Sequence, residues 1–178
     1  MPRIALPTTD TMTPVQRQAY DAVVAGRRGH APAPFLAWLQ SPEFASRAQK
    51  LGEFVRYETT MAPRLSELAI LVVASWWGSA YEWAIHKTEA LRAGVSADVI
   101  DDIAAQRTPR FDRRDDQAVF DFAMSLCHTR AVAESTYRRT VGEIGEQGVV
   151  ELVGVLGYYT LISMTLNAFE IGPPAASS

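Results

Sequence analysis

Hydrophobic residues recur at intervals of three and four along most of this chain, which is the spacing of amphipathic α-helices. No segment alternates apolar and polar residues as a half-buried strand does. Several helical segments begin at Ser or Thr followed by Pro, or end at Gly, the usual start and stop signals of helices. The pattern predicts an all-α fold with about eight helices, at residues 13–26, 41–58, 64–77, 79–94, 96–105, 116–129, 134–145 and 149–169.

The length of 178 residues suits a single domain with its own hydrophobic core. No repeat or low-complexity tract marks a second domain. We expect residues 1–40 to form an N-terminal arm with the first helix, and residues 41–170 to form the helical core. The tail, residues 171–178, is predicted to be disordered.

The segment 149–169 is almost wholly apolar and nearly long enough to span a membrane. However, Glu151 and Asn167 lie inside it, and no basic cluster flanks it. A helix that is apolar on all sides is typically buried in a core or a subunit interface. We therefore predict a core helix rather than a membrane span.

Charge and cysteine content limit which partners and which cell compartment suit this chain. The net charge is −3, so the chain has no basic field to attract nucleic acid or an anionic membrane. Its single cysteine, Cys127, has no partner for an internal disulfide, which suits a reducing compartment. The first residues, "MPRIALPTTD", do not read as a signal peptide. A cytoplasmic protein is expected.

The stretch "GSAYEWAIH" (78–86) carries the candidate chemistry. On a helix, Ser79, Glu82 and His86 lie within about 60° of one another, and Glu82 and His86 form an i,i+4 pair. Gly78 permits a chain reversal, and Ser79 is suited to begin a new helix. The resulting antiparallel hairpin would return Glu67 to the level of His86, whereas one continuous helix would separate them by about 28 Å.

Two carboxylates and an imidazole in one place favour acid–base chemistry. Neighbouring carboxylates raise the pKa of an imidazole, and apolar walls such as Trp76, Trp77 and Trp83 raise the pKa of a carboxylate. Groups tuned in this way exchange protons near neutral pH. A metal site is not predicted, because Glu67, Glu82 and His86 supply a single nitrogen donor.

Structural explanations exist for the same residues. Ser79 and Glu82 match a capping box, Glu82 and His86 match a solvated helix pair, and Glu67 near a helix start matches a dipole contact.

Other polar residues are weaker candidates. Arg56 and Arg64 could hold a substrate carboxylate or simply be surface charges. Tyr158, Tyr159 and Asn167 lie on an apolar helix, so each needs a partner, and one or two of them could face a pocket. Two further side chains, Cys127 and His128, are sequence neighbours that point about 100° apart on a helix, and His30 receives no role.

The stretch "RLSELAILVVASWWGSAYEWAIHKTEALRAGVSADVIDDI" resembles the core of the carboxymuconolactone decarboxylase family, which is related to alkylhydroperoxidase D. The resemblance extends through "RDDQAVFDFAMSLCHT" and "GVVELVGVLGYYTLISMTLNAFEI", and covers most of the chain from about residue 41. It implies an all-helical fold and a homo-oligomer, commonly a trimer or a hexamer.

The hydroperoxidase branch of that family carries a glutamate, then Cys-x-x-Cys, then a histidine. By resemblance, Glu67 matches the glutamate and His86 the histidine, while the cysteine positions fall on Ser79 and Glu82. A serine forms no thiolate and a carboxylate forms no disulfide, so thiol peroxidase activity is not expected.

The decarboxylase branch lacks the thiol pair and is thought to use acid–base chemistry. The resemblance therefore implies a cofactor-free enzyme acting on a small carboxylated lactone or a related carbonyl compound. His86 would move the proton, Glu67 would orient it or act as the base, and Glu82 would be a second carboxylate. Ser79 and Trp83 would contact the substrate. The alternative is a noncatalytic small-molecule binder or scaffold with the same fold.

Overall fold

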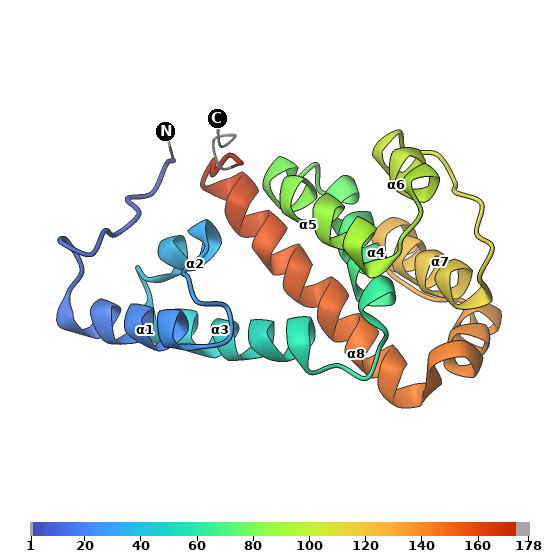
Figure 1. The fold of residues 1–178 in the computed structure, drawn as a ribbon, viewed down its shortest axis with the longest axis horizontal. Coiled ribbons are helices and arrows are strands. Elements are labelled where there is room, and N and C mark those ends of the chain that lie inside the picture. The colour runs from blue at the N-terminus through green and yellow to red at the C-terminus, as the bar shows by residue number, and fades with distance from the viewer. Residues whose placement is uncertain (1, 174–178) are drawn as a thin grey trace.

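Proline in the first turn begins each of the first four helices, where its missing N–H costs no hydrogen bond. A computed structural model describes residues 2–173, and over that range the chain is all-α with no strand (Figure 1). Its eight helices are α1 (Pro14–Ala25), α2 (Ala33–Trp38), α3 (Pro42–Tyr57), α4 (Pro63–Trp76), α5 (Ala80–Ala93), α6 (Ala97–Ala104), α7 (Arg114–Thr129) and α8 (Glu134–Ala168).

The predicted number of helices is correct, although two elements differ. Helix α2 was not predicted, because Pro32 and Pro34 suggested a loop, yet Pro34 occupies the first turn, where proline is tolerated. The last two predicted helices join as α8, and the predicted break between them survives as a kink at Gly145, whose φ is +73°. Most of the predicted disordered tail, residues 174–178, lies outside the described residues.

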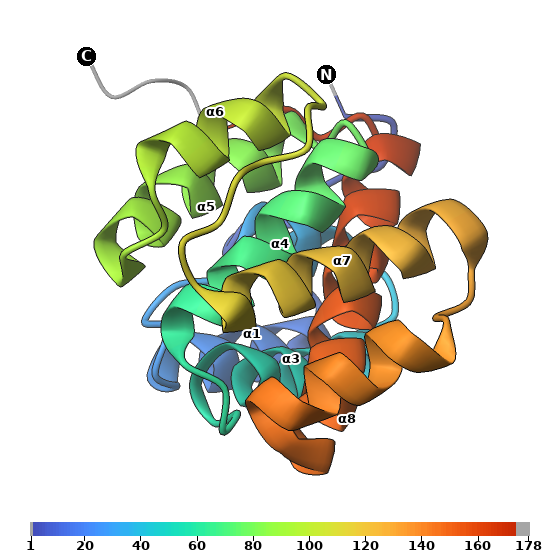
Figure 2. The same ribbon diagram turned by 90° about the vertical axis from the view of Figure 1, so that its right-hand side faces the viewer.

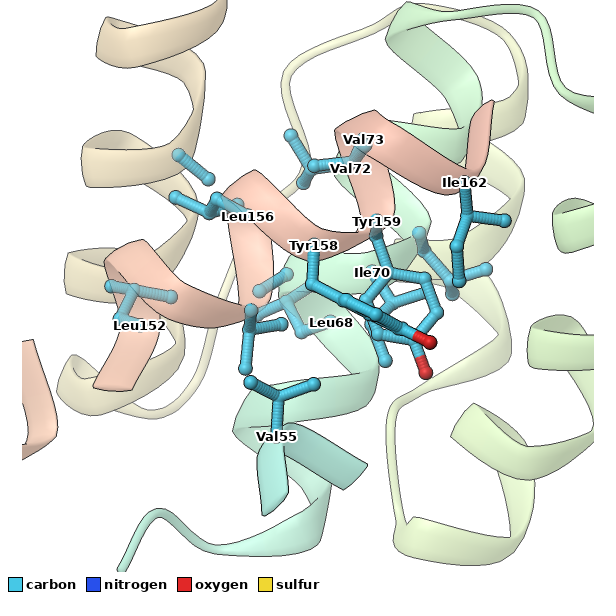
Figure 3. Packing of buried hydrophobic residues seen from close by; sticks show 14 of the residues in the cluster. Val55, Leu68, Ile70, Val72, Val73, Leu152, Leu156, Tyr158, Tyr159 and Ile162 are labelled. Carbon is cyan, nitrogen blue, oxygen red and sulfur yellow. The ribbon is translucent and has the colours of Figure 1, made fainter. Parts of the chain in front are cut away.

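Helix α8 runs through the middle of the fold, with α1, α2 and α3 on one side and α4 to α7 on the other (Figure 1). Helix α4 packs against α5, α7 and α8, and Figure 2 shows α4, α7 and α8 side by side. Side chains of α4 and α8, among them Leu68, Val72, Leu152 and Leu156, interdigitate in the core (Figure 3).

Within the described range, α8 is the one helix whose length and apolar composition would allow it to cross a membrane. However, 61% of the residues in its apolar window are buried inside the fold. The side chain of Glu151 on α8 accepts hydrogen bonds from the backbone N–H and hydroxyl of Thr60, at 2.6 and 2.7 Å. This is the packing of a core helix, as predicted.

The predicted chain reversal at Gly78 is confirmed. Helix α4 ends at Trp76, Gly78 adopts a φ of +58°, and α5 begins at Ala80. The turn is closed by a backbone hydrogen bond from Ser79 N–H to Ala74 O, at 2.9 Å. Because glycine has no Cβ, it occupies this left-handed conformation without strain. The α4–α5 hairpin then packs along its length (Figure 1).

The two helix starts expected at Thr13 and Ser79 are both found, but only Thr13 caps its helix with its side chain. Thr13 accepts from Gln16 N–H, and the Gln16 side chain accepts from Thr13 N–H, which is a complete capping box. Ser79 occupies the N-cap position of α5, but its hydroxyl makes no cap hydrogen bond. The capping box proposed for Ser79 and Glu82 is therefore wrong, because the Glu82 carboxylate is directed to His86 instead.

Candidate functional site

The imidazole of His86 lies between two carboxylates, and the side chain is only 2% exposed. Its Nδ1 lies 2.7 Å from Oε2 of Glu67 on α4, and its Nε2 lies 3.3 Å from Oε2 of Glu82, one turn earlier on α5. A guanidinium nitrogen of Arg56, from α3, lies 3.4 Å from the same Nε2. Three helices thus place charged groups around one buried ring.

The electrostatic balance keeps this imidazole basic. Burial is the largest single effect and lowers the pKa of His86. The hydrogen bonds and negative charges of Glu67 and Glu82 act in the opposite direction and together prevail, so the pKa lies above its ordinary value of 6.5. The ring therefore holds a proton more firmly than a histidine in water.

Glu82 and His86 line a cavity of about 250 Å³, while Glu67 lies behind the ring. The α5 residues on its wall are Tyr81, Glu82, Ile85, His86 and Glu89, which occupy one face of the helix. Opposite them are side chains from α2, α3, α8 and the segment before α2: Arg28, His30, Phe35, Trp38, Gln49, Arg56, Tyr57, Tyr158, Tyr159 and Ile162. The volume is just under the range of about 300–1,000 Å³ for pockets that hold drug-sized ligands, and so fits a smaller molecule.

Tyrosines of α8 form the apolar wall beside the imidazole. The ring of Tyr159 meets His86 edge-on at 5.0 Å and Tyr158 at 5.5 Å, and Figure 3 shows both tyrosines extending from one side of α8. Burial raises the pKa of Tyr158 to about 12 and raises that of Tyr159 as well. Both hydroxyls therefore stay protonated and can donate hydrogen bonds.

The structure brings together three of the five predicted site residues and separates two. Glu67, Glu82 and His86 meet as the hairpin requires. Trp83 is half-buried but does not line the cavity, because it points about 100° away from Glu82 around α5. Ser79 lines a different, open depression near the end of α8, and its buried hydroxyl has no hydrogen-bond partner.

Two residues of the segment before α2, Arg28 and His30, lie on the cavity wall, although neither was predicted to. Their sequence, "GRRGHAPAP", is that of an ordinary connection, and only the three-dimensional fold places it against α5. The suggestion that Tyr158 and Tyr159 face a pocket is confirmed, and Arg56 lies on the same wall. Asn167 instead donates to Trp77 O, at 2.8 Å.

The remaining candidates serve the fold elsewhere. Arg64 is buried and pairs with Asp115, at 2.7 Å, and with Asp116, so it is not a substrate ligand. The ring of His128 packs against Trp76 at a tilt of 57°, with ring centres 4.3 Å apart, and Cys127 packs against the core. Burial raises the pKa of the Cys127 thiol, which disfavours a reactive thiolate. Over the part of the chain that is described, no group of three or more His, Cys, Asp or Glu residues is arranged to hold a metal ion.

Comparison with known proteins supports the resemblance seen in the sequence. Residues 42–119, which contain α3 to α6 and hence Arg56, Glu67, Glu82 and His86, match the model of the carboxymuconolactone decarboxylase family. No curated protein sequence matches the chain.

Solved structures share the fold over nearly the whole chain. An uncharacterized peroxidase-related protein from Silicibacter sp. TM1040 has a TM-score of 0.78 and 15% identity, over 98% of this chain and 92% of that protein. A peroxidase-related protein from Ralstonia eutropha JMP134, described as an alkylhydroperoxidase AhpD core, has a TM-score of 0.79 and 15% identity, over 97% and 92%. A cysteine-to-alanine variant of the debrominase Bmp8, in complex with 2,3,4-tribromopyrrole, has a TM-score of 0.75 and 15% identity, over 98% and 92%. At this identity the likeness concerns the fold alone.

Proposed function

From the match of residues 42–119 to the carboxymuconolactone decarboxylase family, we propose that this chain is an acid–base enzyme that uses no cofactor. Its substrate in this proposal is a small carboxylated lactone or a related carbonyl compound. The observation that carries the proposal is the position of His86, buried between Glu67 and Glu82 and on the wall of a cavity.

His86 has the geometry of a proton carrier. When the ring is neutral, Nδ1–H donates to Glu67 and Nε2 accepts from the Arg56 guanidinium. When Nε2 takes up a proton, the same nitrogen becomes a donor and Glu82 is the acceptor within reach, at 3.3 Å. Either protonation state therefore finds partners already in place, and proton transfer needs little rearrangement.

The proposed reaction uses this exchange at carbon. Loss of a proton from the carbon next to a carbonyl, or of carbon dioxide from a carboxylate there, leaves an electron pair that moves onto the carbonyl oxygen. The Arg56 guanidinium lies beside the imidazole and would stabilise that oxyanion. On the first route neutral His86 would take the proton from one carbon and return it to another, which shifts the double bond and restores the neutral base. On the second route protonated His86 would donate its proton to carbon after carbon dioxide leaves, and would regain a proton from water before the next turnover.

A thiol-based alternative has less support. The family's cysteine positions are Ser79 and Glu82 by resemblance, and the cysteine of this chain, Cys127, lies on α7 and does not line the cavity. The scaffold alternative finds less support, because a scaffold would be expected to pair and pack this cluster closed, whereas His86 lines a cavity of about 250 Å³. A noncatalytic small-molecule binder would have the same cavity, and the turnover test separates it from an enzyme.

The direct test is turnover of γ-carboxymuconolactone and related lactones, followed by loss of the substrate and release of carbon dioxide. His86→Gln should lower kcat by about a hundredfold or more, and Glu67→Gln by about tenfold to a hundredfold. The matched control is His128→Gln, which removes a histidine outside the cavity. If the His86 and Glu67 variants retain wild-type turnover of an accepted substrate, the role assignment fails.

We further propose that the chain is a homo-oligomer, a trimer or a hexamer. Two exposed apolar groups support this proposal: Phe44, Leu51 and Phe54 on α3, and Val150, Val153 and Met164 on α8. The spacing of Phe44, Ala48, Leu51 and Val55 places them on one side of α3, but only Ala48 and Val55 are buried. Light scattering coupled to size-exclusion chromatography measures the subunit count, and a monomer at micromolar concentration would contradict the proposal.

A further inference from the structure

We propose that Arg28 and Arg56 form a two-arginine clamp for carboxylate-bearing substrates, with Arg28 as a specificity-determining residue. Arg56 comes from α3, inside the family-matched segment, whereas Arg28 lies in the connection from α1 to α2, before that segment begins. The inference rests on the proposed function in that it takes the cavity beside His86 as the substrate site.

The two guanidinium groups lack counterions. Within residues 2–173, no carboxylate lies within ion-pair distance of Arg28 or Arg56, whereas Arg64 is paired with Asp115 and Arg92 with Glu89. Arg28 and Arg56 are both half-buried, and the buried Nε–H of Arg28 is a donor without an acceptor. A ligand carboxylate that accepts two N–H groups of a guanidinium would supply both the acceptor and the negative charge.

The acidic side chains of the cavity do not cancel all of these charges. Glu89 accepts from Arg92 at 2.7 Å, and the Glu82 carboxylate is within reach of the His86 ring. Glu67 and Glu82 carry two negative charges, which balance the protonated imidazole and Arg56, so Arg28 is the positive charge that remains without a carboxylate. The cavity is therefore suited to a negatively charged ligand even though the whole chain carries a charge of −3.

The local backbone directs Arg28 to the cavity. Gly29 has a φ of +72°, so the chain reverses immediately after Arg28, and Gly29 N–H donates to Gly26 O at 3.1 Å. The imidazole of His30 lies 3.0 Å from Arg28 O and closes the next turn. The adjacent Arg27 is exposed, lies over the ring of Tyr57 at 4.6 Å and does not line the cavity.

In this proposal the two arginines bind different parts of the ligand. Arg56 lies against the imidazole and so meets the reacting part of the ligand. Arg28 comes from the connection before α2 and its charge acts on Tyr81, whereas both arginines act on Tyr158 and Tyr159. A ligand held by both would present a carboxylate to Arg28 and its carbonyl group to Arg56 and His86.

The test uses two small probes of the same shape, the dianion maleate and its neutral diamide, maleamide, with binding measured by isothermal titration calorimetry on the full chain. Wild type should bind maleate and bind maleamide much more weakly. Arg28→Gln should weaken maleate binding by about tenfold to a hundredfold, as expected for losing charge-assisted hydrogen bonds. Arg27→Gln removes the same charge from the next position and should leave maleate binding unchanged.

Arg28→Lys keeps the charge but loses the forked donor geometry, so its maleate affinity should fall between those of wild type and Arg28→Gln. Circular dichroism of each variant confirms folding, and the lysine variant serves as the test if the glutamine variant is unfolded. The proposal is overturned if wild type binds maleate no better than maleamide, or if the Arg27 and Arg28 variants behave alike. Binding is measured without turnover, so Arg28-dependent binding in a protein that converts no lactone would overturn the proposed function and leave the clamp standing.

Discussion

Nδ1 of His86 lies 2.7 Å from Oε2 of Glu67, although 19 residues separate them along the chain. The contact is made across the α4–α5 hairpin, and both side chains are withdrawn from water, with exposed fractions of 2% and 13%. A carboxylate in this position fixes which ring nitrogen carries the proton and leaves Nε2 on the cavity side for exchange.

Replacing Glu67 with Gln should lower the pKa of His86, because the variant loses one of the two charges that hold it above 6.5. NMR titration of the His86 ring measures this shift directly. The raised pKa stabilises the fold below the unfolded value of 6.5, and this contribution is lost as pH rises through the folded pKa. Glu67→Gln should therefore lose more stability at pH 5 than at pH 9. The exposed Glu43→Gln is the control, and an unchanged titration of His86 in the Glu67 variant would contradict the assignment.

Gly52→Ala should disturb the cavity wall. A Cβ at Gly52 would overlap the hydroxyl end of Tyr158, which is buried and lines the cavity. Overpacking of this kind costs about 1–3 kcal/mol and displaces the tyrosine ring. Gly142→Ala is the control, since nothing lies within 4 Å of its Cβ and alanine favours a helix. Chemical denaturation measures both variants, and equal stabilities would show that Tyr158 has room to move.

Ser79→Ala should leave the free energy of unfolding nearly unchanged or slightly raised. The Ser79 hydroxyl is buried without a hydrogen-bond partner, so its removal deletes no contact. Thr13→Ala, by contrast, removes a working capping box and should cost about 1 kcal/mol. Thermal unfolding measures the stability of the two variants. A large loss of stability in Ser79→Ala would show that the Ser79 hydroxyl caps α5 after all.

Glu151→Gln should destabilise the fold by about 2 kcal/mol, because the carboxylate accepts two hydrogen bonds from Thr60 in the connection between α3 and α4. Burial raises the pKa of Glu151, but the hydrogen bonds from Thr60 and Gln147 outweigh it and the pKa is lowered from 4.5. Its stabilising contribution is therefore present above pH 4.5 and is lost as pH falls through the folded pKa. The free energies of unfolding of wild type and Glu151→Gln, measured by chemical denaturation, should become equal at low pH. The variant of an exposed residue, Glu146→Gln, should have the wild-type stability at every pH.

The α4–α5 hairpin could be predicted because its signals are local. Gly78 and the residues that follow it mark a reversal, and helix periodicity then places Glu67 and His86 at one level. The same periodicity gave a wrong prediction for Ser79. By helix angle Ser79 lies on the same side of α5 as Glu82, but it sits at the N-cap, beyond the end of the cavity, and lines a different depression. For Trp83 the sequence indicated only an apolar residue near the site, and not the direction of its side chain.

The opposite wall of the cavity could not be read from the sequence. Arg28 lies 58 positions before His86, and its place depends on how α1 and α2 pack against α3 and α8, a relationship that no local pattern encodes. Arg56 had been suggested as a carboxylate ligand together with Arg64. What separates them is tertiary pairing: Arg64 forms ion pairs with Asp115 and Asp116, whereas Arg56 lies beside the His86 ring on the cavity wall and forms no ion pair within residues 2–173.

The residues around the His86 ring come from the stretch between α3 and α5. Much of the cavity wall that faces them comes from elsewhere in the chain, from the segment with Arg28 and His30 and from the α8 residues Tyr158, Tyr159 and Ile162. Of the two proposed clamp residues, Arg28 alone lies outside the stretch from α3 to α5, since Arg56 belongs to α3. Exchanging the short connection between α1 and α2 would therefore change the charge that the cavity presents to a ligand at position 28. The imidazole of His86 and its two carboxylates would keep their positions, so ligand charge could be engineered without altering the reacting groups.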